Sequence, residues 1–179
     1  HMESGFGRME RFEIGGTRIT MVLVKNPAGC DRAIDYLRSL SGECTAVFCL
    51  NDNAADGTDV SWIWDAGFER LFDAGGAELR LIVSGERADD MRLRLKYAGA
   101  DEGAIRVLRS QDELLEAVTS AGGEVCILPT YTAMLPLRAA LAAGGPVVVD
   151  CQISPDANVL PMIPPGGTVE NILLEMEED

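Results

Sequence analysis

The chain has 179 residues, with 15 lysines and arginines against 29 aspartates and glutamates, and its formal net charge is −14. This length suits one domain that buries its own core. The negative charge would repel a phosphate backbone, so we expect no nucleic acid as a partner. No apolar run reaches the ~18 residues that a membrane span needs, and no signal peptide is visible, so we expect a soluble protein without a transmembrane segment.

The chain is almost without histidine. Its only histidine is His1, in a His-Met start that is typical of a cloning scar, so we expect the domain to comprise residues 3–179. Any imidazole chemistry must then use a histidine from another chain. The five cysteines contain no Cys-x-x-Cys pair and favour reduced, buried thiols in the cytoplasm. We assign no metal ligand.

Short apolar runs along the chain predict β-strands that are covered on both faces. Such runs are typical of a mostly parallel sheet between two layers of helices. The predicted strands comprise residues 17–24, 45–50, 78–83, 105–108, 124–128 and 146–149.

Helical periodicity fills the intervals between these strands. Residues 31–40, for example, place Ala33, Ile34, Leu37 and Leu40 on one face of a helix. The alternation predicts a Rossmann-like, three-layer α/β/α sandwich. Four prolines make residues 153–168 an irregular excursion. The predicted helices comprise residues 31–40, 89–98, 111–120 and 132–143.

The turn after the first predicted strand, residues 25–29, carries two polar candidates. A parallel sheet places its ligand crevice at the carboxyl ends of the strands. Lys25 and Asn26 could therefore face a nucleotide or substrate there. Proline and glycine in the same turn equally favour a plain helix entry.

The loop of residues 51–65 follows the second predicted strand and contains both tryptophans. A calcium loop that starts at Asp52 fails, because its third and twelfth positions are Ala54 and Ile63. The tryptophans either pack on the domain edge or form a ligand or partner surface. The candidates in this loop are Asp52, Asp56, Asp59, Trp62 and Trp64.

The helix after the third predicted strand begins with two adjacent aspartates, Asp89 and Asp90. One carboxylate is enough to cap the helix or complement its dipole. Successive helical residues point about 100° apart, so the other can project into the crevice or toward a partner. The basic residues of this segment, which form either a docking surface or a solvated face paired with nearby carboxylates, are Arg87, Arg92, Arg94 and Lys96.

Four segments together resemble the C-terminal domain of the MurT family, the Mur-ligase-like subunits of lipid II isoglutaminyl synthase. They are Gly-Phe-Gly-Arg-Met-Glu at residues 5–10, Leu-Val-Lys-Asn-Pro-Ala-Gly at residues 23–29, the tryptophan loop at residues 50–65, and Arg-Ala-Asp-Asp-Met-Arg-Leu-Arg-Leu-Lys-Tyr-Ala-Gly at residues 87–99. The resemblance implies a fold of the Mur ligase C-terminal domain type. It also implies a fragment whose central ATPase domain is absent, in keeping with the missing phosphate-binding glycine loops.

The resemblance also implies an activity for the full-length protein. A MurT ligase uses ATP and magnesium to activate the D-glutamate carboxylate of lipid II, and ammonia from the GatD glutaminase converts it to D-isoglutamine. We expect no cofactor bound tightly to this fragment, and no activity from it alone. Arg8 would sit at the hinge to the missing domain, and Lys25 replaces the histidine usual in the Asn-Pro turn of Mur ligases.

In this family an aspartate of the Arg-Ala-x-Asp-Met motif completes the Cys-His-Asp triad of the glutaminase, and the matching residue is Asp90. Asp89 falls on the variable position and is assigned to capping. Arg87, Arg92 and Arg94 would then lie at the glutaminase interface. The alternative is a non-catalytic, Rossmann-like module that binds a nucleotide or a protein, because fold alone does not define function.

Overall fold

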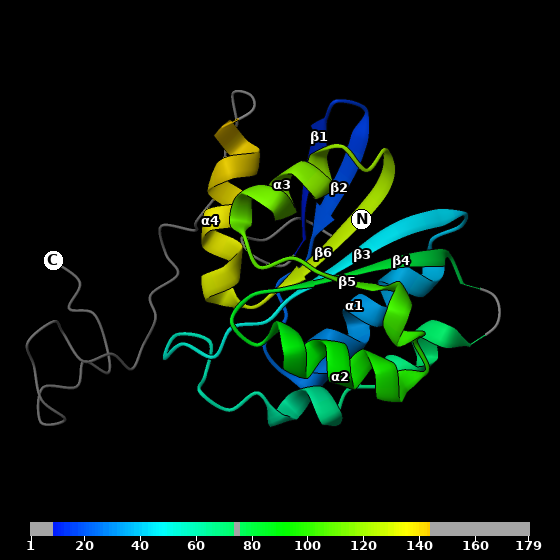
Figure 1. Cartoon of the computed structure of the whole chain (residues 1–179), viewed down its shortest axis with the longest axis vertical. Helices are drawn as coiled ribbons and strands as arrows, with labels where there is room; N and C mark the ends of the chain where they lie inside the picture. Colours follow the sequence, from blue (N-terminus) through cyan, green and yellow to red (C-terminus); the bar gives the residue numbers. More distant parts are fainter. Residues whose placement is uncertain (1–8, 74–75, 144–179) are drawn as a thin grey trace, which may run out of the picture. The chain divides into compact units, whose positions relative to one another are not determined.

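The computed structural model describes residues 9–73 and 76–143. Within these ranges six strands and four α-helices alternate after an initial hairpin (Figure 1). The strands are β1 (Glu10–Ile14), β2 (Thr17–Met21), β3 (Glu43–Cys49), β4 (Glu78–Ser84), β5 (Ile105–Val107) and β6 (Gly123–Pro129). The helices are α1 (Pro27–Ser39), α2 (Ala88–Ala98), α3 (Gln111–Thr119) and α4 (Tyr131–Ala143), with short 3-10 helices η1 (Ser61–Trp64), η2 (Phe68–Phe72) and η3 (Glu102–Ala104).

The strands form one sheet in the order β1-β2-β6-β3-β4-β5. All neighbouring pairs are parallel except β1 and β2, which pair antiparallel. The pairing of β2 with β6 extends past Met21, because the backbone N–H groups of Val22 and Val24 donate to carbonyls that follow in β6. The sheet is therefore mostly parallel, as predicted.

Helices cover both faces of the sheet and enclose two cores. In β3, Phe48 packs with residues of α1 and α2, whereas Val47 packs with residues of α3 and α4. This alternation follows from the two-residue period of a strand. Figure 1 shows α1 and α2 on one side of the sheet and α3 and α4 on the other. The three-layer α/β/α sandwich predicted from the sequence is confirmed.

Strand β1 was not predicted from the sequence. This strand forms a hairpin with β2 through a two-residue turn at Gly15 and Gly16, whose φ angles are +57° and +81°. A tight hairpin turn of this kind requires positive φ at both positions, which glycine adopts without strain. The Gly-Gly pair after the alternation of Phe12 and Ile14 was the available signal.

Helix α1 begins at Pro27, four residues before the predicted start at residue 31. Asn26 is its N-cap, and its side-chain Oδ1 accepts a hydrogen bond from the Gly29 backbone N–H at 2.8 Å. Proline suits the first helical position because its missing N–H would have no partner there. The predicted strand at residues 146–149 and the irregular segment at residues 153–168 lie outside the described residues.

The cysteines in the described part of the chain are free and buried, as predicted. Burial raises the pKa of the Cys30 and Cys49 thiols to about 12 and that of Cys44 to about 11. Burial likewise raises the pKa of Cys126. These thiols pack as small hydrophobic side chains, and Cys151 lies outside the described residues.

Candidate functional site

The carboxyl ends of three neighbouring strands are joined through one residue, Asn51, directly after β3. Its backbone N–H donates to Thr130 Oγ1 at 3.0 Å, and its side-chain Nδ2 donates to Thr132 Oγ1 at 2.9 Å. Its Oδ1 accepts a hydrogen bond from the Glu86 backbone N–H at 3.0 Å. Asn51 therefore fixes the segments that follow β3, β4 and β6 relative to one another. Sequence reasoning did not single out Asn51 or Thr132, although each follows a strand within three residues.

Close approach of the chain after β4 to the end of β3 depends on Gly85. A Cβ atom at this position would lie 2.5 Å from the Leu50 carbonyl oxygen, and the glycine has a φ of +91°. The same carbonyl accepts a hydrogen bond from the Arg87 backbone N–H at 2.9 Å. The start of α2 is thus anchored to β3.

Asp56 and Asp59 stabilise the tryptophan loop itself. Asp56 accepts hydrogen bonds from the Thr132 backbone N–H at 2.7 Å and from Thr132 Oγ1 at 2.6 Å. Asp59 accepts a hydrogen bond from the Ser61 backbone N–H at 2.7 Å, and its bonds with Ser61 lower its pKa. Within residues 9–73 and 76–143, no three His, Cys, Asp or Glu side chains are arranged to hold a metal ion.

The two tryptophans have different environments. Trp62 is half-buried and packs against the core beneath α1 and α2. Trp64 is exposed, and its ring lies edge-on to Tyr97 of α2, with 5.7 Å between ring centroids. Trp62 therefore packs on the domain, whereas a role of the exposed Trp64 in a ligand or partner surface stays a prediction.

Arg94 is buried, and its prediction as an interface residue is wrong. Its guanidinium donates to the carbonyl oxygens of Ile63 at 2.9 Å and Ala66 at 2.8 Å. It also pairs with Glu69 at 2.9 Å, and this hydrogen bonding lowers the Glu69 pKa. The cation stacks over the rings of Trp64 and Phe68. Arg94 thus holds η1 and η2 against α2 by donating to two carbonyls of that segment, because buried carbonyls need hydrogen-bond donors.

The adjacent carboxylates Asp89 and Asp90 pair with different arginines. Asp89 Oδ2 lies 2.8 Å from Arg109 Nη2, and Asp90 Oδ2 lies 3.0 Å from Arg87 Nε. The N-cap of α2 is Arg87, and no side chain caps the helix. The assignment of Asp89 to capping is therefore wrong, although both carboxylates lie in the first turn, where they complement the helix dipole.

A second carboxylate also reaches Arg87. Asp52 Oδ2, from the loop after β3, lies 3.5 Å from Arg87 Nη1. Asp52, Arg87 and Asp90 thus form a charged group between the tryptophan loop and α2, which we call the Arg87 cluster. Its three side chains are partly exposed, and that of Asp90 is 44% accessible.

The outer face of α2 carries apolar side chains beside Asp90. Leu93 and Tyr97 are both exposed, and they follow Asp90 at helical spacings of three and seven residues. Such spacings place all three on one face. Arg92 and Lys96 both pair with Glu102, at 3.2 Å and 2.6 Å, so this one carboxylate compensates one of their two positive charges.

The remaining candidates lie at the start of the chain and in the turn after β2. Lys25 is exposed there, and Asn26 beside it directs its side chain to the cap of α1. Arg8 lies outside the described residues.

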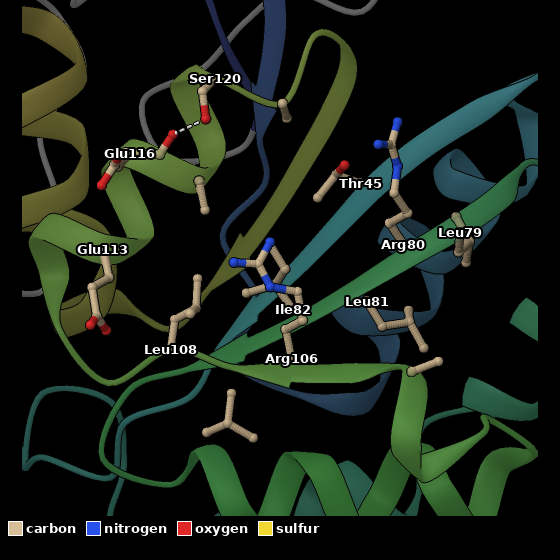
Figure 2. A pocket seen from close by; sticks show the side chains of 14 residues that line it. Thr45, Leu79, Arg80, Leu81, Ile82, Arg106, Leu108, Glu113, Glu116 and Ser120 are labelled. Carbon is tan, nitrogen blue, oxygen red and sulfur yellow. Dashed lines mark hydrogen bonds between the residues drawn. The ribbon is translucent and has the colours of Figure 1, made fainter.

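One hollow lies away from all of these residues. It is an open groove of about 820 Å³ on the sheet face beside α3. Figure 2 shows Glu113 and Glu116 of α3 and its C-cap residue Ser120 on one side, and Arg80 and Arg106 of the strands on the other. A smaller pocket of about 130 Å³ includes Asn51, Gly85, Arg109 and Thr132 in its lining. Of these two hollows, the smaller one adjoins the strand-end loops.

The sheet order, the two helix layers and the loops joined at the strand ends define a Rossmann-like α/β domain of the kind that occurs in folylpolyglutamate synthase. The crystal structure of that enzyme from Thermotoga maritima matches 80% of this chain and 32% of its own, with a TM-score of 0.55 and 18% identity. The model of the MurT ligase C-terminal family matches residues 23–134. This chain belongs to that family.

Two curated relatives carry the same name, lipid II isoglutaminyl synthase (glutamine-hydrolyzing) subunit MurT. The protein from Streptococcus pneumoniae is 37% identical over 77% of this chain, and that from Staphylococcus aureus strain COL is 38% identical over 73%. The matched regions cover 31% and 29% of those relatives, so the chain spans about a third of their length. No helix within residues 9–73 and 76–143 is long and apolar enough to cross a membrane.

Proposed function

We propose that this chain is the C-terminal domain of the ligase subunit of a glutamine-dependent lipid II isoglutaminyl synthase. The full-length subunit would use ATP and magnesium to activate the D-glutamate carboxylate of lipid II, and ammonia from a GatD-like glutaminase would complete the amide. Family membership and the name of the relatives support this function. ATP binding is assigned to the part of the relatives that this chain does not match, because the chain contains no phosphate-binding glycine loop.

The partly exposed carboxylate of Asp90 is the observation that supports the glutaminase part of the proposal. Its carboxylate is partly exposed in the first turn of α2, and it matches the aspartate of the Arg-Ala-x-Asp-Met motif. In a triad the carboxylate accepts a hydrogen bond from the imidazole N–H, holds the correct tautomer and stabilises the imidazolium. Since the only histidine of this chain is His1, the imidazole would come from the glutaminase.

The outer face of α2 is also suited to contact a glutaminase. A carboxylate serves an imidazole only within about 2.6–3.2 Å, so the glutaminase must cover the first turn of α2. The next two turns present Leu93 and Tyr97 on the same face, and Tyr97 packs against Trp64. Exposed apolar side chains that adjoin one another are typical of an interaction surface. Arg87 and Arg92 would lie at the edge of this contact.

Lys25 and Asn26 would face the nucleotide or acceptor when the domain closes on the ATP-binding part. Lys25 is the stronger candidate, because its side chain is exposed at the carboxyl end of β2 whereas that of Asn26 caps α1. The cytoplasm is the proposed location, where ATP is available and buried thiols such as Cys49 stay reduced.

The test uses two neighbouring substitutions in the complex of the full-length subunit with its glutaminase. Asp90→Asn should leave assembly intact and lower kcat for glutamine hydrolysis by about 10⁴-fold, because a neutral amide favours the wrong tautomer. Asp89→Asn removes the adjacent carboxylate and should have little effect. Equal activity of the two variants would refute the proposed role of Asp90, and the reverse ranking would assign the role to Asp89.

A further inference from the structure

We infer that Arg87 is a positioning residue for glutamine hydrolysis, which holds the Asp90 carboxylate in place for the histidine of the partner. This inference rests on the proposed function and adds a second residue to it. Arg87 itself touches neither the glutamine nor the nucleophile. It acts through Asp90.

Arg87 is anchored through its backbone and paired through its guanidinium. Its backbone N–H donates to the Leu50 carbonyl at 2.9 Å, which anchors the residue to the end of β3. Its guanidinium lies 3.0 Å from Asp90 Oδ2 and 3.5 Å from Asp52 Oδ2. A side chain held in this way restricts the rotamers of the carboxylate it pairs with. The ion pair with Arg87 involves Oδ2 of Asp90. A carboxylate has two oxygens, so the other oxygen can accept a hydrogen bond from another donor.

The net charge of the Arg87 cluster also suits a triad aspartate. A triad aspartate has to stay negative, because its function is to stabilise an imidazolium. One arginine paired with one aspartate has no net charge, whereas Arg87 is shared between Asp52 and Asp90, so the Arg87 cluster has a net charge of −1. The cluster therefore orients Asp90 and still presents negative charge toward the partner.

The neighbouring carboxylate lacks this arrangement. Asp89 pairs with Arg109 through both carboxylate oxygens, at 2.9 and 2.8 Å. That pair is neutral, and its aspartate is more exposed, at 67% against 44% for Asp90. The geometry thus distinguishes two adjacent aspartates that look equivalent in the sequence.

The experiment measures glutamine hydrolysis by the complex of the full-length subunit with its glutaminase. Arg87→Gln should lower kcat by about 10- to 100-fold, because catalytic groups displaced by about 1 Å lose activity on this scale. The KM for glutamine should stay unchanged, since the substrate binds to the partner. Arg87→Lys retains the charge and should recover part of the loss. Arg109→Gln removes the arginine of the neighbouring pair and should change neither constant.

The outcomes separate this inference from the proposed function. If Asp90→Asn inactivates the complex while Arg87→Gln behaves like Arg109→Gln, the positioning role is overturned and the proposed function stands. If Asp90→Asn retains full activity, the role of Asp90 in the proposed function is refuted, and the inference about Arg87 is overturned with it. Should Arg87→Gln prevent assembly, Asp52→Asn gives the same test, because it leaves Asp90 in a neutral pair. A lower kcat in that variant supports the inference, and an unchanged kcat overturns it.

Discussion

Replacing Arg94 with methionine tests whether this buried arginine supports the fold instead of an interface. Methionine keeps the unbranched aliphatic stem but removes the donors to the Ile63 and Ala66 carbonyls. It also removes the cation that stacks over the rings of Trp64 and Phe68. The segment comprising η1 and η2 should then lose its main polar attachment to α2.

The size of the effect follows from these contacts. The Ile63 carbonyl is left without a donor, which costs about 1–3 kcal/mol, whereas the Ala66 carbonyl keeps the hydrogen bond from the Phe68 backbone N–H. A desolvated cation-π contact adds about 1–2 kcal/mol. Removing a buried charge also relieves a desolvation penalty of several kcal/mol, which offsets part of the loss. We expect a net loss of about 1–3 kcal/mol, or roughly 2–12 °C in Tm for a chain of this size.

Urea unfolding of the 179-residue chain, followed by far-UV circular dichroism, measures this loss as a lower midpoint. Arg92→Met is the matched control, because Arg92 lies on the same helix but pairs with Glu102 at the surface. It should unfold close to the unmodified chain, since exposed ion pairs contribute little. Equal midpoints for the two variants would refute the structural role of Arg94.

The remaining predictions concern a buried thiol and the outer face of α2. The pKa of Cys49 is raised from 9.0 to about 12, so the folded chain retains a proton that the unfolded chain loses, and stability falls as pH rises from about 9 to 12. Cys49→Ala should reduce this fall by about 1.4 kcal/mol per pH unit in urea titrations, and an unchanged slope would contradict the assignment. Leu93→Ser should weaken glutaminase binding about tenfold in a titration of the full complex, without changing kcat at saturation. Leu135→Ser, on α4 at 43% exposure against 45% for Leu93, should bind normally, and identical binding by both variants would remove this face of α2 from the interface.

The helices and parallel strands were predictable because their apolar periods are long. Helix α3, for example, was predicted at residues 111–120 and found at Gln111–Thr119. Strand β1 was missed because its pattern spans only five residues. The start of α1 was predicted four residues too late because its first turn contains Pro27 and Gly29 instead of apolar residues. Local turn chemistry decides both boundaries.

The candidate site was predictable by residue type but not by partner. Asp90 and Arg87 were both identified from the helix start. The ion pair between Arg87 and Asp52, however, joins residues that lie 35 positions apart in the sequence. Arg94 was misassigned because helical spacing alone does not show that the Ile63 and Ala66 carbonyls face it. Long-range polar contacts of this kind leave no periodic signal in the sequence.

The sheet order has a consequence for how the domain is made on the ribosome. Strand β6 is the last of the described strands to be synthesised, yet it lies between β2 and β3. Until residues 123–129 emerge, β2 and β3 each expose an unpaired edge, and long-range parallel pairing of this kind is slow. The β1-β2 hairpin and the β3-β4-β5 segment must therefore wait as separate pieces. A nascent chain stalled before Gly123 should consequently bind chaperones, and release of β6 joins the two pieces in one step.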